Sequence, residues 1–364
     1  MASQQNVTSR MVPGRPDYAI LTTSLVLVVI GLVFVYSASF AIALDAFDNV
    51  YFFVIRQTGA ALIGLVLMFG LMRLDYHILR PWSPILMLGA VGSLTLVLVI
   101  GNDAYGARRW IPMGPLPPFQ PSEFAKLAAI IYISAWLASR GGTVKSFALG
   151  FVPFIFLVGL VSGLILIEPD TGTAMIVVLA TASLFFIAGA SITHLGAMAG
   201  IGAVMAVLLL IGGGHRSDRI TSFISPHSDP DGLGFQTLQL LIALFAYLVY
   251  RGFRVAMNAR DDFGCYLALG ITCWVAFQTL INIGGITRSI PLTGIPLPFL
   301  SYGGSSIVMI MAAMGVLLSV SRYGKDRTYL ERAEPRKKRF HIRSPIIPRT
   351  PQRGGVTRVT TTRA

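Results

Sequence analysis

Long apolar runs without a charged residue dominate this chain, and the short segments between them hold most of its Asp, Glu, Lys and Arg. Three of the runs, residues 18–44, 146–167 and 263–287, are longer than the roughly 20 residues that a helix needs to cross a bilayer. The pattern therefore predicts an all-α polytopic membrane protein.

The breaks between the runs predict about ten transmembrane helices. The stretch from Thr171 to His215 contains no charged residue and is too long for one helix, so we divide it at residues 189–191, Gly-Ala-Ser, which suit a turn. The expected spans are residues 18–44, 55–72, 82–101, 122–139, 147–167, 172–189, 195–212, 233–250, 263–285 and 304–321.

Composition separates this chain from soluble enzymes. Of its 364 residues, 54% are hydrophobic and 12% are charged, whereas soluble domains carry about 25% charged residues. We expect three parts: a cytoplasmic leader at residues 1–17, a membrane domain at residues 18–322, and a basic disordered cytoplasmic tail at residues 323–364.

The net charge of +13 does not indicate nucleic-acid binding. Residues 322–364 hold 13 Lys and Arg against 3 Asp and Glu, so the membrane body is nearly neutral. The basic residues of the tail either keep this end of the chain in the cytoplasm or bind anionic lipid head groups. The short loops favour the same orientation, with nine Lys and Arg on the expected inner side and six on the outer side. Both termini are therefore expected in the cytoplasm.

Ionisable residues at membrane depth are few. Glu123 and Lys126 lie three residues apart in the fourth expected span and share a helix face. They are either a buried ion pair that fixes packing or part of a substrate site. At the outer end of the fifth span, Glu168 and Asp170 flank Pro169, where a turn between two helices explains their presence.

Arginines on the expected outer face run against the usual bias of basic residues toward the cytoplasm. The pair Arg108 and Arg109 lies in one outer loop, and Arg216 and Arg219 lie in another. Residues 291–306, rich in Pro, Gly and hydroxyl groups, precede the last span and cannot form a regular helix. We expect these segments to converge over a cavity that holds an anionic ligand such as a phosphate.

The sequence contains no metal-ligand spacing and no nucleotide-binding glycine loop, so no cofactor is predicted. It leaves open whether a divalent cation takes part. The two cysteines, Cys265 and Cys273, lie too far apart along one helix to form a disulfide with each other.

Four motifs in this order resemble the SEDS family (shape, elongation, division and sporulation). They are Arg-Trp-Ile at residues 109–111, Gln-Pro-Ser-Glu at 120–123 with Lys126, Pro-Asp-Thr-Gly-Thr-Ala at 169–174, and Pro-Phe-Leu-Ser-Tyr-Gly-Gly-Ser-Ser at 298–306. The resemblance covers nearly all of residues 17–322, and the first two spans look most like the FtsW branch.

The resemblance implies a ten-span peptidoglycan glycosyltransferase in the bacterial cytoplasmic membrane. Its substrate would be lipid II, a disaccharide-pentapeptide on undecaprenyl pyrophosphate, and its partners a class B penicillin-binding transpeptidase and other division proteins. Glu123 and Lys126 match the polar pair of the family's central cavity, and the outer arginines suit a pyrophosphate. The other positions that match family motifs are Arg109, Asp170, Arg219, Gln236, Gln239, Ser301 and Gly303.

One family element is absent. After the motif that contains Gln236 and Gln239, the family continues with a stretch that carries the aspartate held essential for polymerisation, whereas here no acidic residue lies between Asp231 and Asp261. Asp231 and Asp229 are the candidate surrogates for this carboxylate. Three functions stay open: a polymerase, a non-catalytic scaffold of the division apparatus, and a transporter of lipid-linked precursors.

Overall fold

The computed structural model describes most of the membrane domain. The chain divides into two units, residues 1–325 and 326–364, and every described residue belongs to the first. The described residues are 14–104, 107–114, 117–194, 196–198, 200, 202, 234–287, 289 and 294–324.

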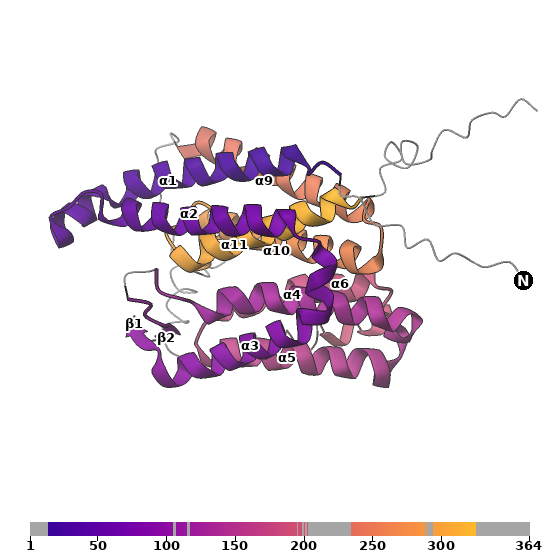
Figure 1. The fold of residues 1–364 in the computed structure, drawn as a ribbon. Coiled ribbons are helices and arrows are strands. Elements are labelled where there is room, and N and C mark those ends of the chain that lie inside the picture. Colours follow the sequence, from indigo (N-terminus) through magenta and orange to yellow (C-terminus); the bar gives the residue numbers. More distant parts are fainter. Residues whose placement is uncertain are drawn as a thin grey trace, which may run out of the picture. The chain divides into compact units, whose positions relative to one another are not determined.

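Nine long helices account for most of these residues (Figure 1). They are α1 (Tyr18–Phe47), α2 (Phe52–Arg73), α3 (Leu79–Ile100), α4 (Pro121–Arg140), α5 (Val152–Ile167), α6 (Thr171–Ile187), α9 (Gly234–Met257), α10 (Asp262–Ile286) and α11 (Gly304–Arg322). Short helical turns, η1 (Tyr76–Ile78), η2 (Gly141–Lys145) and η3 (Phe147–Phe151), extend α3, α4 and α5.

The predicted helical membrane architecture is confirmed. Eight helical segments of the described residues are long and apolar enough to cross a membrane, and α6, with 17 residues, is a shorter apolar helix. These nine correspond to nine of the ten expected spans. Most of the remaining span, residues 195–212, lies outside the described residues.

A β-hairpin interrupts the helical pattern. Strands β1 (Asn102–Ala104) and β2 (Ala107–Trp110) pair antiparallel in the loop between α3 and α4, and Ile111 pairs with Phe119 beyond them. The sequence analysis predicts an outer loop here and no strands, because these strands are too short for an alternating pattern to stand out. The hairpin orders a loop that carries Arg108 and Arg109.

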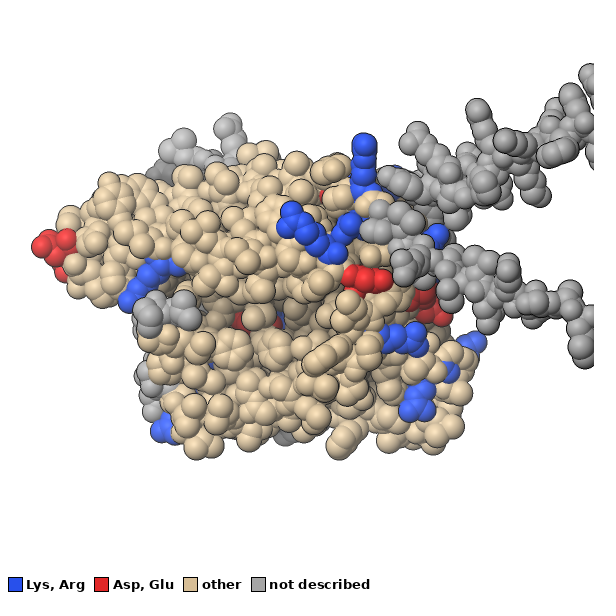
Figure 2. All heavy atoms as spheres, in the orientation of Figure 1, with Lys and Arg blue, Asp and Glu red and all other residues tan. Residues whose placement is uncertain are grey.

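The helix loops define two ends of the bundle. We call the end with the β-hairpin and residues 168–170 and 294–303 the hairpin end, and the end with Asp17 the N-terminal end. Charge is distributed unequally between them. The buried Lys126 is left out of this count. Among the other described Lys and Arg residues, nine lie at the N-terminal end and three, Arg56, Arg108 and Arg109, lie at the hairpin end. Figure 2 shows charged side chains toward both ends and a largely uncharged surface between them.

The bundle has a buried centre and an exposed, apolar periphery. In an 18-residue apolar stretch of α10, and in one of α11, 72% of the residues are buried, whereas in α1 the share is 22%. Figure 1 shows α1, α2, α9 and α11 on one side and α3 to α6 on the other, and α10 packs against both α9 and α4. Side chains on the central helices are therefore the ones able to meet across the bundle.

Helix starts follow local chemistry at the N-terminal end. The Asp17 carboxylate accepts hydrogen bonds from the backbone N–H groups of Ala19 and Ile20 and so caps α1. The same carboxylate pairs with Arg251 of α9, with Nη2 and Oδ2 2.5 Å apart. One acidic residue thus starts the first helix and fastens it to a helix more than 230 residues away.

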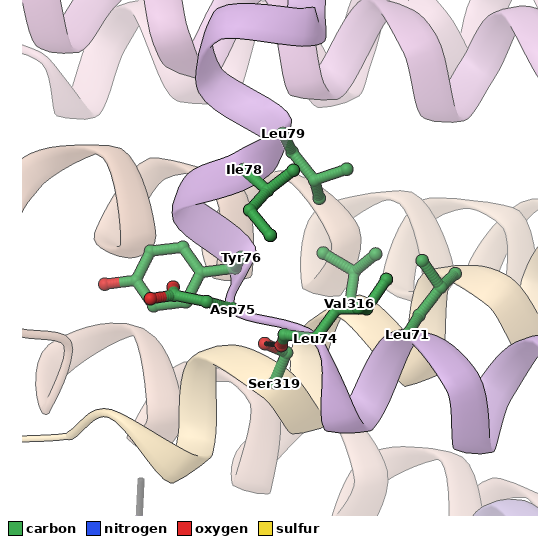
Figure 3. A pocket seen from close by; sticks show the side chains of 8 residues that line it. All are labelled: Leu71, Leu74, Asp75, Tyr76, Ile78, Leu79, Val316 and Ser319. Carbon is green, nitrogen blue, oxygen red and sulfur yellow. Dashed lines mark hydrogen bonds between the residues drawn. The ribbon is translucent and has the colours of Figure 1, made fainter. Parts of the chain in front are cut away.

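A small pocket lies at the N-terminal end where α2 turns into α3 (Figure 3). Its walls are mainly aliphatic, and the Ser319 hydroxyl donates to the Leu74 carbonyl oxygen at 2.6 Å beside it. The lining residues are Leu71, Leu74, Asp75, Tyr76, Ile78, Leu79, Val316 and Ser319. A site for a charged sugar carrier needs more polar groups than this pocket offers.

The close contact of α2 with α11 depends on Gly315 and generates a stability prediction. A Cβ atom at Gly315 would lie 2.6 Å from the Met68 carbonyl oxygen, and backbone cannot move aside cheaply. Gly315→Ala should therefore destabilise the protein by about 1–3 kcal/mol.

Thermal unfolding in detergent measures this effect. Gly59→Ala is the matched control, because Gly59 lies within α2 and a Cβ atom added there would meet no other atom within 4 Å. It should leave stability unchanged or slightly raised. Equal melting temperatures for Gly315→Ala and Gly59→Ala would contradict the close packing of α2 and α11.

Candidate functional site

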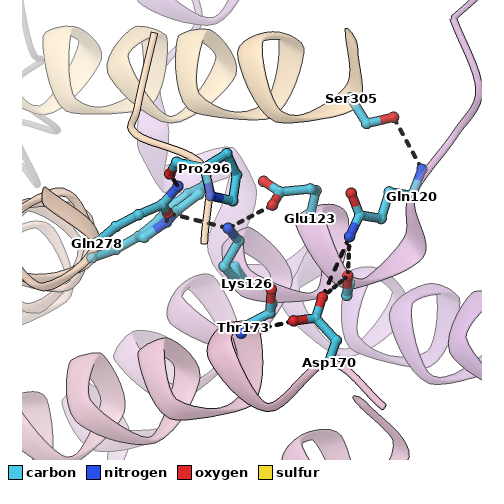
Figure 4. Close-up of polar contacts among 10 residues, drawn as sticks. Gln120, Glu123, Lys126, Asp170, Thr173, Gln278, Pro296 and Ser305 are labelled. Atoms are coloured by element: carbon cyan, nitrogen blue, oxygen red, sulfur yellow. Dashed lines mark hydrogen bonds and ion pairs between the residues drawn. The ribbon is translucent and has the colours of Figure 1, made fainter. Parts of the chain in front are cut away.

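A buried ion pair forms the centre of the site (Figure 4). Pro121 occupies the first turn of α4, where its missing N–H costs nothing, and Glu123 lies in the same turn near the positive end of the helix dipole. Lys126 Nζ lies 2.8 Å from Glu123 Oε1, and each side chain is only 1% exposed. The structure therefore brings together the two residues whose spacing predicted a shared helix face.

Gln278 of α10 is the second partner of Lys126. Its Oε1 accepts from Lys126 Nζ at 3.2 Å and from Trp274 Nε1 at 2.6 Å. Lys126 Nζ also lies 5.0 Å from the centre of the Trp274 ring, within range of a cation–π interaction. The ammonium is thus satisfied from both α4 and α10.

Two amides of α10 hold the segment that precedes α11. Gln278 Nε2 donates to the Pro296 carbonyl oxygen at 2.8 Å, and Asn282 Nδ2 donates to the Ile295 carbonyl oxygen at 2.7 Å. One helical turn separates the two amides, so they bind consecutive carbonyls of one extended stretch. Irregular backbone at this depth needs such partners.

Gln57 of α2 fixes the other end of that segment. Its Nε2 donates to the Ser301 carbonyl oxygen at 3.3 Å, and its Oε1 accepts from the Gly303 N–H at 3.2 Å. The Ser301 hydroxyl accepts from the Leu297 N–H at 2.7 Å. The loop is therefore held in shape by the carbonyl and hydroxyl groups of Ser301 and by the backbone N–H of Gly303.

Asp170 joins α6 to the start of α4. Its Oδ1 caps α6 by accepting from the Thr173 N–H at 3.1 Å. Its Oδ2 accepts from Gln120 Nε2 at 3.4 Å and from the Ser122 hydroxyl at 3.5 Å (Figure 4). The Gln120 N–H in turn donates to the Ser305 hydroxyl of α11 at 3.0 Å, so α4, α6 and α11 converge at the hairpin end.

Arg109 lies over the corner between α5 and α6. Its Nε donates to the Glu168 carbonyl oxygen at 2.9 Å and its Nη2 to the Pro169 carbonyl oxygen at 2.5 Å. A guanidinium has five N–H donors, so these two bonds do not exhaust it. Arg109 therefore both braces this corner and brings positive charge to the hairpin end.

The Glu168 side chain is buried beside this corner. It is 1% exposed, and neither carboxyl oxygen has a hydrogen-bond partner among the described residues. Burial, and then the negative charge of Asp170, raise the pKa of Glu168 to about 8, against the lowering influence of Arg109. Glu168 is therefore mostly protonated at neutral pH.

The remaining candidates are spread over other elements. Arg108 is exposed on β2. Gln239 is exposed on α9, and no contact between it and the Glu123–Lys126 pair is seen in the described part of the chain. Among those residues, no group of three or more His, Cys, Asp or Glu could hold a metal ion. The side chain of Gln236 and the residues Arg216, Arg219, Asp229 and Asp231 lie outside what the structure describes.

Sequence reasoning missed the amides that organise the site. Gln278 and Asn282 lie within a span that has no charged residue, and Gln57 lies one position after Arg56 near the start of its span. A polar amide in such a span also needs a partner, which was the available signal. The partners themselves lie far away along the chain.

The buried ion pair generates a prediction on stability. Lys126→Met should destabilise the protein by about 3–5 kcal/mol, because it leaves Glu123 as an unpaired buried charge. Combining it with Glu123→Gln should restore most of that loss, since no buried charge remains. Lys145→Met, at an exposed lysine near the end of the same helical segment, is the control. Thermal melts that do not distinguish Lys126→Met from Lys145→Met would contradict the pairing.

Glu168 generates a prediction on pH. The folded state raises its pKa from 4.5 to about 8, so the folded protein binds this proton more tightly than the unfolded chain does. Its contribution to stability is full below about pH 4.5 and is lost as pH rises toward 8. The melting temperature of the wild type should fall across this window relative to that of Glu168→Gln. Parallel pH profiles would show that this carboxyl is not buried.

Comparison with known proteins places this geometry in a family. The sequence model of the FtsW, RodA and SpoVE family, described as cell cycle protein, matches residues 18–244 and 238–326. The two matched stretches overlap at residues 238–244. Together they include the ion pair, the α5–α6 corner and the segment before α11.

Curated relatives support the same grouping. Stage V sporulation protein E of Bacillus subtilis is 37% identical over 359 residues, which cover 85% of this chain and 98% of that protein. A probable peptidoglycan glycosyltransferase FtsW of Geobacter sp. is 34% identical over 354 residues, covering 84% and 96%. Because 85% of 364 residues is about 309, about 50 of the 359 positions aligned with the sporulation protein have no residue from this chain.

Solved structures agree with the sequence comparison. The rod shape determining protein RodA of Thermus thermophilus has a TM-score of 0.68 at 29% identity, covering 88% of this chain and 99% of that one. A chain from "Structural coordination of polymerization and crosslinking by a peptidoglycan synthase complex" has a TM-score of 0.68 at 27% identity, covering 84% and 98%. This chain therefore belongs to the FtsW, RodA and SpoVE family, the SEDS family of multi-pass bacterial membrane proteins.

Proposed function

We propose that this chain is a peptidoglycan glycosyltransferase-type protein that acts on lipid II during cell division or cell-wall growth. The observation that carries the proposal is the buried Glu123–Lys126 pair. Next to this pair, hydrogen bonds join the N-terminal ends of α4, α6 and α11. Arg109 lies over the neighbouring corner between α5 and α6. Relatives named as probable peptidoglycan glycosyltransferases support the reaction type.

In this proposal the hairpin end faces the outside of the cytoplasmic membrane. Nine described Lys and Arg at the N-terminal end against three at the hairpin end support this orientation, since basic residues near span ends are retained in the cytoplasm. Both termini are then cytoplasmic. Peptidoglycan is assembled on the outer side, where the hairpin end would meet the sugar part of the substrate.

The reaction needs charge stabilisation more than it needs a strong acid. The acceptor hydroxyl oxygen forms a bond to the anomeric carbon, the bond from that carbon to the pyrophosphate oxygen breaks, and a carboxylate takes the hydroxyl proton. Cationic side chains favour the departing pyrophosphate. We assign this role to Arg109 and the outer arginines Arg108, Arg216 and Arg219.

The carboxylate base is the part of the reaction that the sequence leaves open, because the family's aspartate has no counterpart here. The break in the family match at residues 238–244 and the about 50 unmatched positions support the absence of an internal segment at this point. Asp231 and Asp229 precede the break and are the proposed surrogate bases. The same absence favours a second function, a non-catalytic scaffold of the division apparatus.

The proposed partner is a single-span transpeptidase of the class B penicillin-binding type. A structural relative that belongs to a peptidoglycan synthase complex supports it, because that complex coordinates polymerisation and crosslinking. Polymerisation assays should therefore include such a transpeptidase.

Labelled lipid II distinguishes the two functions. The purified full chain with its transpeptidase should form glycan strands, and Asp231→Ala or Asp229→Ala should reduce their yield at least tenfold. A chimera that receives the unmatched segment of the sporulation relative after residue 244 is the matched control for folding and assembly. Polymer from the chimera but not from the natural chain would reject the polymerase and favour the scaffold.

A further inference from the structure

Gln278 forms hydrogen bonds both with the buried ion pair and with the segment before α11. Its Oε1 accepts from Lys126 at 3.2 Å and from Trp274 at 2.6 Å, while its Nε2 donates to the Pro296 carbonyl oxygen at 2.8 Å. Donors face the oxygen and an acceptor faces the nitrogen, so the amide has a single satisfactory orientation. Its two ends therefore report on two different parts of the site.

The segment at residues 294–303 is held by buried apolar side chains, Ile295, Leu297, Phe299 and Leu300, and by side-chain hydrogen bonds to its backbone. It contains no regular helix, and its backbone is held by Gln278, Asn282 and Gln57. It also presses against α1, since a Cβ atom at Gly31 would lie 2.2 Å from the Phe299 carbonyl oxygen. A change at one of these contacts therefore shifts backbone that lines the hairpin end.

Lys126 is able to alter the Gln278 contact. Its ammonium is shared between Glu123 Oε1 and Gln278 Oε1, and Glu123 Oε2 has no partner among the described residues. Hydrogen bonds from a charged donor are roughly twice as strong as neutral ones. Loss or reorientation of the ammonium thus weakens the hold on the Gln278 amide.

We propose that Gln278 is a positioning residue that couples the Glu123–Lys126 pair to the segment at residues 294–303. When Lys126 turns away from Gln278, the amide loses one of its two donors and the Pro296 carbonyl is held less firmly. The coupling itself follows from these contacts. Its use in the glycosyltransferase reaction, where a bound substrate redirects Lys126, rests on the proposed function.

Hydrogen exchange of the backbone amides of residues 294–303 tests the coupling in the full chain in lipid nanodiscs. Gln278→Leu should raise their exchange rate about tenfold, the equivalent of one lost hydrogen bond. The neutral pair Glu123→Gln with Lys126→Met should raise it several-fold without leaving a buried charge. The triple variant should exchange no faster than Gln278→Leu alone, because both changes act through the same amide.

Asn282→Leu is the matched control. Asn282 holds the neighbouring Ile295 carbonyl at 2.7 Å, but no contact with Lys126 is seen in the described part of the chain. Its effect should therefore multiply with that of the neutral pair. Unchanged exchange in the neutral pair, or effects of the neutral pair and Gln278→Leu that multiply, would overturn the coupling.

Gln278→Glu separates the two ends of the amide. An ionised Glu at this position keeps an oxygen for Lys126 and Trp274 but loses the donor to Pro296. The exchange rate should rise as in Gln278→Leu, while the indole N–H resonance of Trp274 should move less than it does in Gln278→Leu. Equal shifts of that resonance would contradict the assignment. None of these measurements requires polymerase activity, so their outcome is independent of the test of function.

Discussion

A lysine ammonium inside a membrane bundle is the constraint around which the site is arranged. An unpaired charge at this depth is costly, so Lys126 requires an anion and further acceptors within reach. Glu123 supplies the anion from the same helix, and Gln278 supplies an oxygen from α10. These contacts join α4 to α10 at the centre of the bundle.

Around the ion pair, neutral amides do most of the organising. Gln57, Gln278 and Asn282 bind backbone groups of the segment at residues 294–303, which has no helix or sheet to satisfy them. Arg109 likewise donates hydrogen bonds to the backbone carbonyls of Glu168 and Pro169, which follow α5. A site built this way holds irregular backbone in place in an apolar environment.

The sequence was sufficient for nine of the ten expected spans and for the shared helix face of the ion pair. Charge-free runs identify the helices because the bilayer excludes charge, and the spacing of Glu123 and Lys126 places both on one helix face. The partner Gln278 lies 152 positions from Lys126, so no local pattern reveals it. The β-hairpin is too short to show a strand pattern. Arg109 was predicted to bind an anion, and its bonds to two backbone carbonyls depend on how α5 and α6 meet.

The affinity of the full chain for undecaprenyl pyrophosphate, measured by native mass spectrometry, tests whether the buried Glu123–Lys126 pair organises the substrate site. The variant with Glu123→Gln and Lys126→Met removes both buried charges and should remain folded. Its affinity should fall at least tenfold while its melting temperature stays within a few degrees of that of the wild type. Equal affinity of the folded variant and the wild type would contradict the claim that the buried pair organises the substrate site.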